Sequence, residues 1–196
     1  MRRILLALVF SLVAVAQQPP ARILVAYHSG TGNTEKLAVS IRDGAAAVQG
    51  VDVTLRKAAE FKYDEITGYD GVVLGTPVHW SGVSVEAKRF LDGIGGALWK
   101  AKTNGDGRTA GVFCTAGHPS MGKDTVRLSV LSAFLTMRFV VVGGVESEGF
   151  GTLGPEATTG PADPGISEKE MAEARRFGER FAQVTRSLRQ ARGARP

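Results

Sequence analysis

The chain has 196 residues and a mass of 20.7 kDa, and 43% of the residues are hydrophobic, which suits one globular domain of ordinary composition with a sizeable core. Its formal net charge is +5, and much of the excess arginine lies between Arg175 and Arg195. Because charged residues normally cover the exposed face of an amphipathic helix, we interpret this stretch as a helix face plus a frayed tail and expect no nucleic acid as a partner, with association with anionic lipid or polyanions as the alternative.

The first twenty residues have the pattern of a targeting segment. A basic start, Met1-Arg2-Arg3, precedes an apolar run from Ile4 to Val13, and Ala14-Val15-Ala16 matches the small-x-small pattern of a signal-peptidase site. We therefore predict a signal peptide or leader over residues 1–20 and an exported protein, periplasmic or extracellular. A leader that stays attached would keep the protein near a membrane, and a misread leader would leave it in the cytoplasm.

Apolar strand-like runs alternate with helical patterns along the rest of the chain, which is typical of a parallel sheet covered on both faces. After a first strand that begins at Arg22, the pattern predicts, in order, a helix over 35–48, strands over 51–55 and 71–75, a short helix over 85–91, a strand over 109–114, a helix over 125–135, a strand over 139–142 and a helix over 168–188. Ser167 and Glu170 have the spacing of a capping box for the last helix. Residues 143–165 are rich in glycine, proline and threonine and are interpreted as a surface or active-site loop.

The segment Ser29-Gly30-Thr31-Gly32-Asn33-Thr34, between the first strand and its helix, is the most distinctive in the chain. Glycines let backbone amides approach an anion, the three hydroxyl side chains donate hydrogen bonds, and the helix directs its positive end to the same point. The segment lacks both the lysine of a GxxxxGK[ST] loop and the GxGxxG spacing of a dinucleotide fingerprint. It therefore predicts a cradle for one terminal phosphate, with a sharp helix cap as the alternative.

Five parallel strands with right-handed crossovers and a phosphate loop after the first strand predict an α/β, flavodoxin-like three-layer sandwich with strand order 2-1-3-4-5. Ligands bind such sheets outside the carboxyl ends of the strands. Residues 29–34, 76–82 and 115–122 should therefore meet there. We assign residues 21–190 to this domain and 191–196 to a basic tail.

Several of these motifs resemble a known family. Residues 29–34 are similar to the [ST]-x-T-G-x-T phosphate loop of flavodoxins and related flavin mononucleotide (FMN) proteins. Residues 75–82, followed by a helix ending in Phe90-Leu91-Asp92, resemble the second flavin loop of the WrbA-like NAD(P)H:quinone oxidoreductases, and residues 111–117 resemble their third. The resemblance covers residues 21 to about 189. It implies noncovalently bound FMN, with NADH or NADPH and a quinone as small-molecule substrates.

The resemblance also implies a cofactor site made from three loops. The phosphate would be held by Ser29, Gly30, Thr31, Gly32, Asn33 and Thr34. The isoalloxazine would be lined by Thr76, Pro77, Val78, His79, Trp80 and Gly82, with Trp80 as an aromatic wall, and its pyrimidine edge would contact Cys114, Thr115, Ala116, Gly117 and His118. Trp99 would lie beside the substrate at the mouth of the site. The flavin performs the hydride chemistry itself, so no catalytic protein residue is predicted.

Other interpretations of the same side chains remain open. The histidines lack neighbouring carboxylates or cysteines at ligand spacing, so we predict no metal site. We interpret His28 as a surface or capping residue, whereas His79 and His118 either line the site or lie in exposed loops. Cys114, the single cysteine, excludes an intramolecular disulfide and is interpreted as a small buried hydrophobe. Trp80 and Trp99 could instead fill gaps in the core.

The predicted function is NAD(P)H-dependent two-electron reduction of a quinone by a homo-oligomer, either a dimer or a tetramer. The segment 57–69 is shorter than in the WrbA-like family, which argues against the tetramer, and residues 134–137 lack the family's histidine. The alternative is a flavodoxin-type carrier that passes electrons between proteins. Such carriers are generally acidic, which counts against this alternative. Export counts against the reductase, because NAD(P)H is scarce outside the cytoplasm.

Overall fold

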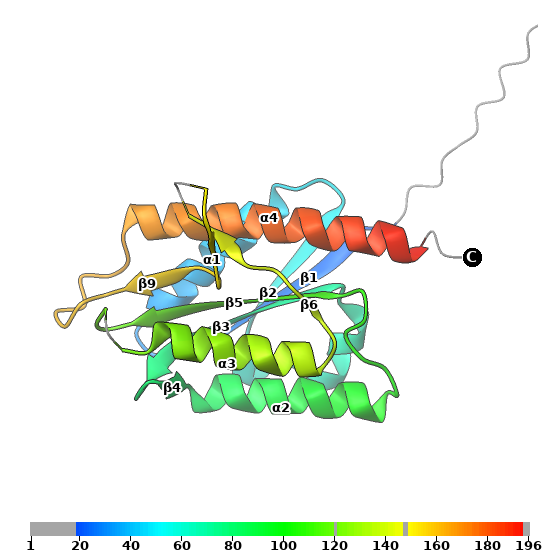
Figure 1. The fold of residues 1–196 in the computed structure, drawn as a ribbon, viewed down its shortest axis with the longest axis horizontal. Coiled ribbons are helices and arrows are strands. Elements are labelled where there is room, and N and C mark those ends of the chain that lie inside the picture. Colours follow the sequence, from blue (N-terminus) through cyan, green and yellow to red (C-terminus); the bar gives the residue numbers. More distant parts are fainter. Residues whose placement is uncertain (1–18, 120, 147–148, 194–196) are drawn as a thin grey trace, which may run out of the picture.

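The computed structural model describes residues 19–119, 121–146 and 149–193, so the predicted leader lies outside the described residues except for its last two positions. A central sheet is covered by helices on both faces, which gives three layers (Figure 1). Within the described ranges, no helix combines the length and the apolar character needed to cross a membrane.

The central sheet is parallel and follows the order β2-β1-β3-β5-β6. Its strands are β1 (Ala21–Tyr27), β2 (Val51–Lys57), β3 (Gly71–His79), β5 (Thr109–Ala116) and β6 (Val140–Val141). Because β4 (Gly82–Val83) is only a short arm folded back on β3, this is the predicted order 2-1-3-4-5, and the predicted flavodoxin-like sandwich is confirmed. The central strands are buried on both faces, which explains their continuous apolar sequences.

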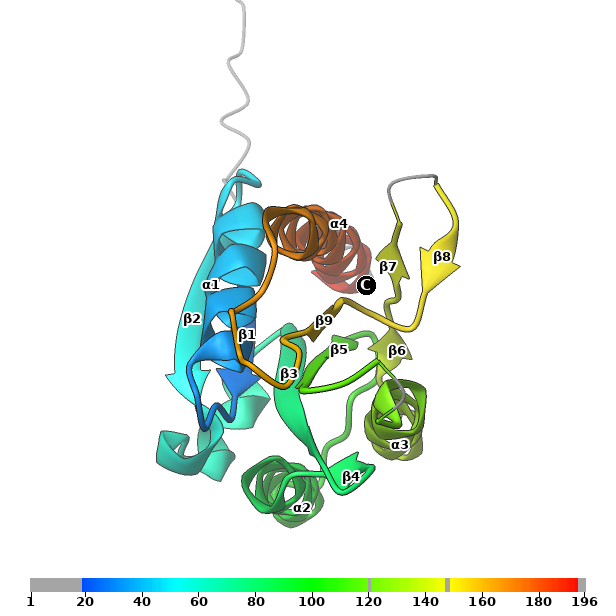
Figure 2. The same cartoon turned by 90° about the vertical axis from the view of Figure 1, so that its left-hand side faces the viewer.

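Two pairs of helices cover the sheet. Viewed from the carboxyl ends of the strands, α1 (Asn33–Ala46) and α4 (Glu168–Gly193) lie on one face, whereas α2 (Val85–Lys100) and α3 (Lys123–Thr136) lie on the other (Figure 2). Gly178 brings α4 close to α1, because a Cβ at this position would lie 2.1 Å from the carbonyl oxygen of Ile41. The connection from β2 to β3 is made by the short 3₁₀ helices η1 (Ala58–Glu60) and η2 (Tyr63–Gly68).

Several element boundaries differ from those predicted. The helix predicted over 85–91 continues to Lys100, and the last helix continues to Gly193, so residues 191–193 are not a tail. The capping box is confirmed: Ser167 Oγ accepts a hydrogen bond from the Glu170 amide at 3.3 Å, and the Glu170 carboxylate accepts one from the Ser167 amide at 2.7 Å.

The fifth strand position is divided between two short strands. β6 pairs with the start of β5, and β9 (Glu156–Thr158) pairs with its end, both in parallel. The chain between them forms the hairpin of β7 (Gly144–Val145) and β8 (Gly151–Thr152), which extends beyond the sheet edge (Figure 2). The segment predicted as one long loop over 143–165 therefore carries three short strands in its described part.

Candidate functional site

The predicted phosphate loop turns from β1 into α1 at the carboxyl end of the sheet. Gly32 has φ 92°, a left-handed conformation that glycine adopts without strain, and it directs the chain into the helix. Ser29 Oγ accepts long hydrogen bonds from the amides of Gly32 (3.1 Å) and Glu35 (3.3 Å). These amides point into the loop, where an anion would be a stronger acceptor than a hydroxyl.

Space above this loop is available for a ligand. A Cβ at Gly30 or Gly32 would meet no atom within 4 Å, and the same holds for Gly117 in the third loop. Thr31 is exposed, whereas Thr34 is 2% exposed. The N-terminal amides of α1 have no partners within the helix. The groups that can donate hydrogen bonds here are these amides and the threonine hydroxyls, none of which carries a charge, and they suit one phosphate group.

The second predicted loop is a β-hairpin. Val78 pairs with Val83 and His79 with Gly82, so Thr76 to His79 belong to β3 and the two-residue turn consists of Trp80 and Ser81. Both turn residues have positive φ, 51° and 61°, as a type I′ hairpin turn requires. Trp80 is 97% exposed at this turn, so it does not fill the core.

Buried hydroxyls fix the base of this hairpin. Thr76 Oγ1 donates to Ser84 Oγ at 3.0 Å, and the Ser84 hydroxyl in turn accepts from the amide of Ala87 in the first turn of α2. Thr76 is completely buried, so its hydroxyl holds the hairpin against α2 rather than lining an open surface. Pro77 and Val78 lie in the same strand.

The third predicted loop begins later than expected. Cys114, Thr115 and Ala116 belong to β5 and are buried, whereas Gly117 and His118 are exposed beyond its end. The thiol of Cys114 lies in a small apolar cluster with Val78 and Val126, and burial raises its pKa to about 12. The side chain of Cys114 is therefore an inert core group, as the sequence favoured. Ser120 lies outside the described residues.

Direct contacts join the three loops. Thr34 Oγ1 and Thr115 Oγ1 share a buried hydrogen bond of 2.7 Å, which links the first loop to the third. A Cβ at Gly122 would lie 3.0 Å from the Cβ of Ser81, so the third loop also lies against the hairpin turn. The predicted convergence of the loops is thus present in the structure.

A histidine pair links the first loop to the second. The rings of His28 and His79 meet edge to face with centroids 5.7 Å apart, and His28 Nδ1 lies 3.2 Å from a carboxylate oxygen of Glu86 in the first turn of α2. The interpretation of His28 as a surface or capping residue missed this contact. Its partners lie 51 and 58 positions away in the sequence, where no local pattern indicates them.

Another contact missed from the sequence lies beside the phosphate loop. Asn33 Nδ2 donates to Thr31 Oγ1 at 3.0 Å and to the carboxylate of Asp163 at 2.7 Å. The segment before α4 therefore lies against this loop and brings a negative charge close to the predicted phosphate position.

The structure does not place Trp99 at the site. Trp99 lies in the last turn of α2, whose first turn adjoins the hairpin, and fourteen residues of helix span about 21 Å. The last turn of α2 lies at the opposite end of the sheet from the loops (Figure 1), and Trp99 in this turn is 87% exposed. Within one chain, α2 therefore carries Trp99 away from the three loops, and its place beside the substrate stays a prediction.

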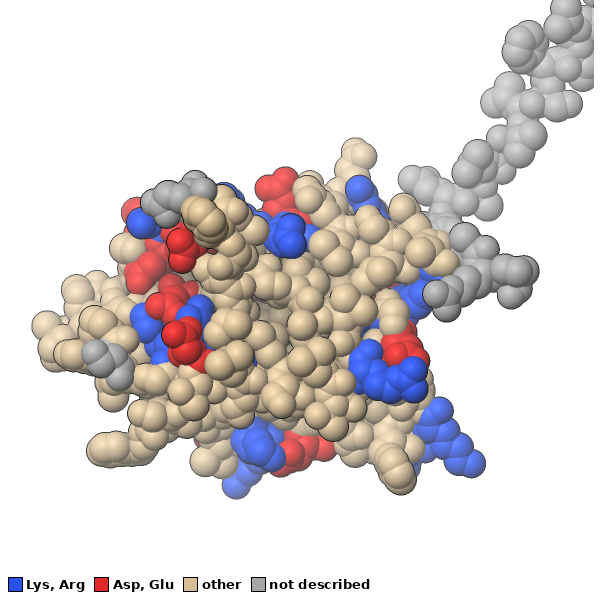
Figure 3. All heavy atoms as spheres, in the orientation of Figure 1, with Lys and Arg blue, Asp and Glu red and all other residues tan. Residues whose placement is uncertain are grey.

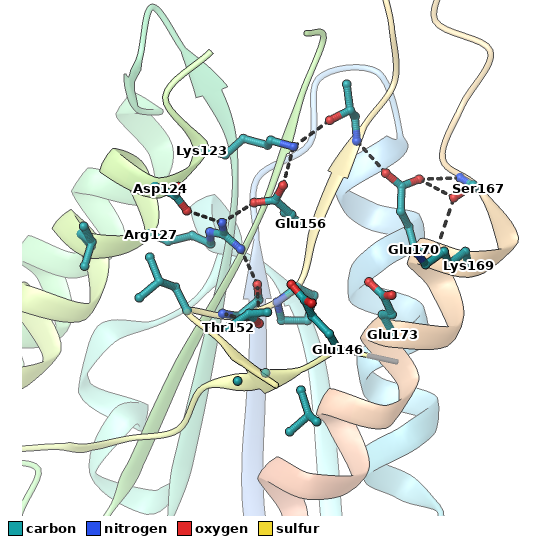
Figure 4. Close-up of a pocket in the computed structure, with 18 residues that line it drawn as sticks. Lys123, Asp124, Arg127, Glu146, Thr152, Glu156, Ser167, Lys169, Glu170 and Glu173 are labelled. Atoms are coloured by element: carbon teal, nitrogen blue, oxygen red, sulfur yellow. Dashed lines mark hydrogen bonds and ion pairs between the residues drawn. The ribbon is translucent and has the colours of Figure 1, made fainter. Parts of the chain in front are cut away.

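A charged cavity of about 960 Å³ lies apart from the three loops, between α3 and α4 (Figure 4). Lys123 and Arg127 of α3 both point at Glu156 of β9, with Lys123 Nζ 2.5 Å from Glu156 Oε1. Arg127 also donates to the carbonyl oxygen of Gly154 and pairs with Asp124. These charges neutralise one another, and the pairs attach β9 to α3.

Comparison with known proteins agrees with this geometry. A family model described as Flavodoxin matches residues 25–117. A flavodoxin of Aquifex aeolicus is 30% identical over 162 residues, which cover 83% of this chain and 85% of the relative. An NAD(P)H dehydrogenase (quinone) of Archaeoglobus fulgidus is 28% identical over 194 residues, which cover 86% of this chain and 99% of the relative. The crystal structure of a WrbA-like flavodoxin from Agrobacterium tumefaciens superposes with a TM-score of 0.68 at 23% identity, covering 86% of this chain and 99% of that one.

The fold and the converging loops define a doubly wound α/β protein with a phosphate-ligand site at the carboxyl ends of its strands. The chain belongs to the flavodoxin family. This family implies FMN, and the residues fit that cofactor: the phosphate loop offers uncharged amides and hydroxyls beside open space, and the hairpin that meets the other loops carries an exposed tryptophan.

Proposed function

We propose that this flavodoxin-like oxidoreductase binds FMN and reduces quinones with NADH or NADPH. The convergence of the phosphate loop, the Trp80 hairpin and the Gly117 turn is the observation that supports the proposal most strongly. Bound FMN would supply the hydride chemistry. The relative named as a quinone-dependent NAD(P)H dehydrogenase, aligned over 99% of its length, supports this choice of substrates.

The roles of the chain's own residues follow from their positions. The amides of the first turn of α1, with the hydroxyls of Thr31 and Thr34, would hold the phosphate. The indole of Trp80 would pack against the flavin ring, and this contact would bury a side chain that is now 97% exposed. Gly117 leaves room for backbone groups to reach the ring edge.

A carrier that exchanges electrons with proteins is the second candidate, supported by the 30% identical relative named flavodoxin. Anaerobic mixing of the FMN-loaded protein with NADH or NADPH separates the two. Loss of the flavin absorbance with the nicotinamide alone, followed by its return on addition of a soluble quinone, supports the reductase. Reduction only in the presence of a partner reductase protein supports the carrier and contradicts our proposal.

Export and self-association are further proposals. Cleavage after Ala16 would yield a mature chain that starts at Gln17, and N-terminal sequencing of protein from the periplasm or medium tests it. An uncleaved, cytoplasmic chain would contradict export. Light scattering of the FMN-loaded protein tests the homo-oligomer, either a dimer or a tetramer, and a monomeric mass would contradict it.

A further inference from the structure

One end of the molecule is strongly basic. At the amino ends of the parallel strands, hydrogen bonds and ion pairs bring six segments together, for example Asp70 N to Arg22 O (2.8 Å), Gly105 N to Met137 O (2.8 Å) and Arg186 Nη1 to Gln49 O (3.0 Å). We call this surface the amino-end face. It consists of residues 21–22, 49–52, 67–70, 99–108, 135–140 and 186–193.

Charge is distributed unevenly between this face and the rest of the protein. The amino-end face has eight Lys and Arg side chains and three Asp side chains, a net charge of +5, whereas the other described residues have a net charge of −2. Basic side chains accordingly project at the right-hand end of the molecule in Figure 3. Asp70 pairs with both Arg189 and Arg192, and Asp106 pairs with Arg138, so five of the eight basic side chains on this face form no ion pair within the described residues.

Exposed apolar side chains lie on the same face. Trp99 is 87% exposed, Leu135 57% and Val140 43%. A cavity of about 560 Å³ beside Trp99 is lined by Lys100, Lys102, Thr103 and Asn104. A tryptophan with flanking lysines is the combination that proteins place at the boundary between water and lipid.

The chain also enters the fold here. Ala21, whose amide donates to Gly50 O at 2.8 Å, begins β1 on this face, directly after the predicted leader of residues 1–20. We propose that the amino-end face docks on an anionic phospholipid surface, with Trp99 at the interface and Lys100 and Lys102 facing the lipid phosphates. Each Lys or Arg near such a surface strengthens binding through the negative surface potential.

This docking would orient the molecule. The loops of the cofactor site lie at the carboxyl ends of the strands, opposite the amino-end face (Figure 1). They would therefore face away from the bilayer, and electron donors and acceptors would reach them from the aqueous side. The orientation depends only on the fold and holds for the reductase and for the carrier alike.

The two tryptophans, Trp80 and Trp99, lie at opposite ends of the molecule and can report this orientation. The full chain is prepared as Trp80→Phe, which leaves Trp99, and as Trp99→Phe, which leaves Trp80. Each is mixed with phosphatidylglycerol-containing vesicles that carry brominated lipid, which quenches nearby indoles. We expect the fluorescence of Trp99 to be quenched and that of Trp80 to be unchanged. The quenching of Trp99 should disappear in high salt, because salt screens the attraction between the lysines and the lipid. Quenching of both tryptophans, or of Trp80 alone, would overturn the proposal.

Charge variants separate docking by this face from insertion of the leader, which both variants share. Lys100→Glu with Lys102→Glu should lower partitioning onto anionic vesicles by about 30-fold or more, since each lysine near the surface contributes about fivefold and the two new carboxylates are repelled. The matched control, Lys57→Glu with Lys62→Glu, changes two exposed lysines outside this face and should have much the smaller effect. Circular dichroism verifies that both variants are folded.

Three results would overturn the proposal. If the protein bound neutral phosphatidylcholine vesicles as tightly as anionic vesicles, the leader alone would hold it on the membrane. If the Lys57→Glu/Lys62→Glu variant lost as much vesicle binding as the Lys100→Glu/Lys102→Glu variant, only the net charge of the protein would matter. Displacement from the vesicles by duplex DNA at the same phosphate concentration would indicate a nucleic-acid surface instead.

Discussion

The hydrogen bond between Thr34 and Thr115 allows the phosphate cradle to be tested separately from the fold. The two hydroxyl oxygens lie 2.7 Å apart, and the residues are 2% and 4% exposed. Valine has nearly the shape of threonine, so Thr34→Val removes the hydroxyl and leaves that of Thr115 buried without its partner. The free energy of unfolding without FMN should fall by about 1–3 kcal/mol.

Loss of the same hydroxyl should also weaken FMN binding. If Thr115 donates to Thr34, the hydroxyl hydrogen of Thr34 is available to the phosphate. A hydrogen bond to a charged group contributes about 1.5–3 kcal/mol, which corresponds to an increase in Kd of about 10- to 150-fold. Fluorescence quenching of FMN measures the affinity, and urea denaturation measures the stability.

The double variant Thr34→Val/Thr115→Val distinguishes the two effects. It removes both buried hydroxyls, so its stability should return to within about 1 kcal/mol of the wild type, whereas its FMN affinity should stay as low as that of Thr34→Val. Recovery of both quantities together would refute the reasoning, because it would show that Thr34 supports the loops without donating to the phosphate. Unchanged FMN affinity in Thr34→Val would refute it as well.

Three further predictions concern single side chains. Asp163→Asn removes a negative charge beside Asn33 and should tighten FMN binding by about 2- to 5-fold at low salt. Binding of riboflavin, which has no phosphate, should not change. An equal effect on riboflavin would exclude repulsion of the phosphate as the cause. The thiol of Cys114, with its pKa raised to about 12, should resist alkylation at pH 9 in the folded protein, and rapid alkylation of the folded protein would contradict this. The free energy of unfolding should fall as the pH rises from about 8.5 towards 12, because the thiol ionises at lower pH in the unfolded chain than in the folded protein. Gly178→Ala places a Cβ 2.1 Å from Ile41 O and should lower the free energy of unfolding by about 1–3 kcal/mol, which lowers the melting temperature. Gly96→Ala, where a Cβ meets nothing within 4 Å, should be neutral or stabilising. Similar effects of the two substitutions would contradict the close packing of α1 and α4.

The sequence predicted the order of the strands and the meeting of three loops, because apolar runs and glycine-rich turns are local signals. It missed the length of α2, since three glycines, at positions 93, 95 and 96, follow the predicted end of that helix. The structure shows why one of them is a glycine within a helix: a Cβ at Gly93 would lie 2.5 Å from the ring of Tyr63, so this glycine is needed for packing and does not end the helix. The place of Trp99 beside the substrate came from the family resemblance and not from the predicted end of this helix.

The divided fifth strand was also beyond the reach of a local pattern. β9 has three residues, and Pro155, just before it, accepts a hydrogen bond from the Cys114 amide at 3.1 Å. Gly154 has φ 145°, and a Cβ there would lie 2.0 Å from Val112 O. Contacts between residues about 40 positions apart thus decide this part of the sheet, as they decide the pairing of His28 with Glu86.

The comparison of FMN with riboflavin tests the central claim most directly. The two ligands share the isoalloxazine ring, and only FMN has the phosphate that the amides and hydroxyls of residues 29–34 are proposed to hold. Titration of the full chain should show FMN bound at least about 100-fold more tightly than riboflavin, the factor expected from about 3 kcal/mol of hydrogen bonds to the phosphate. Equal affinities for the two, or no binding of FMN, would contradict the account.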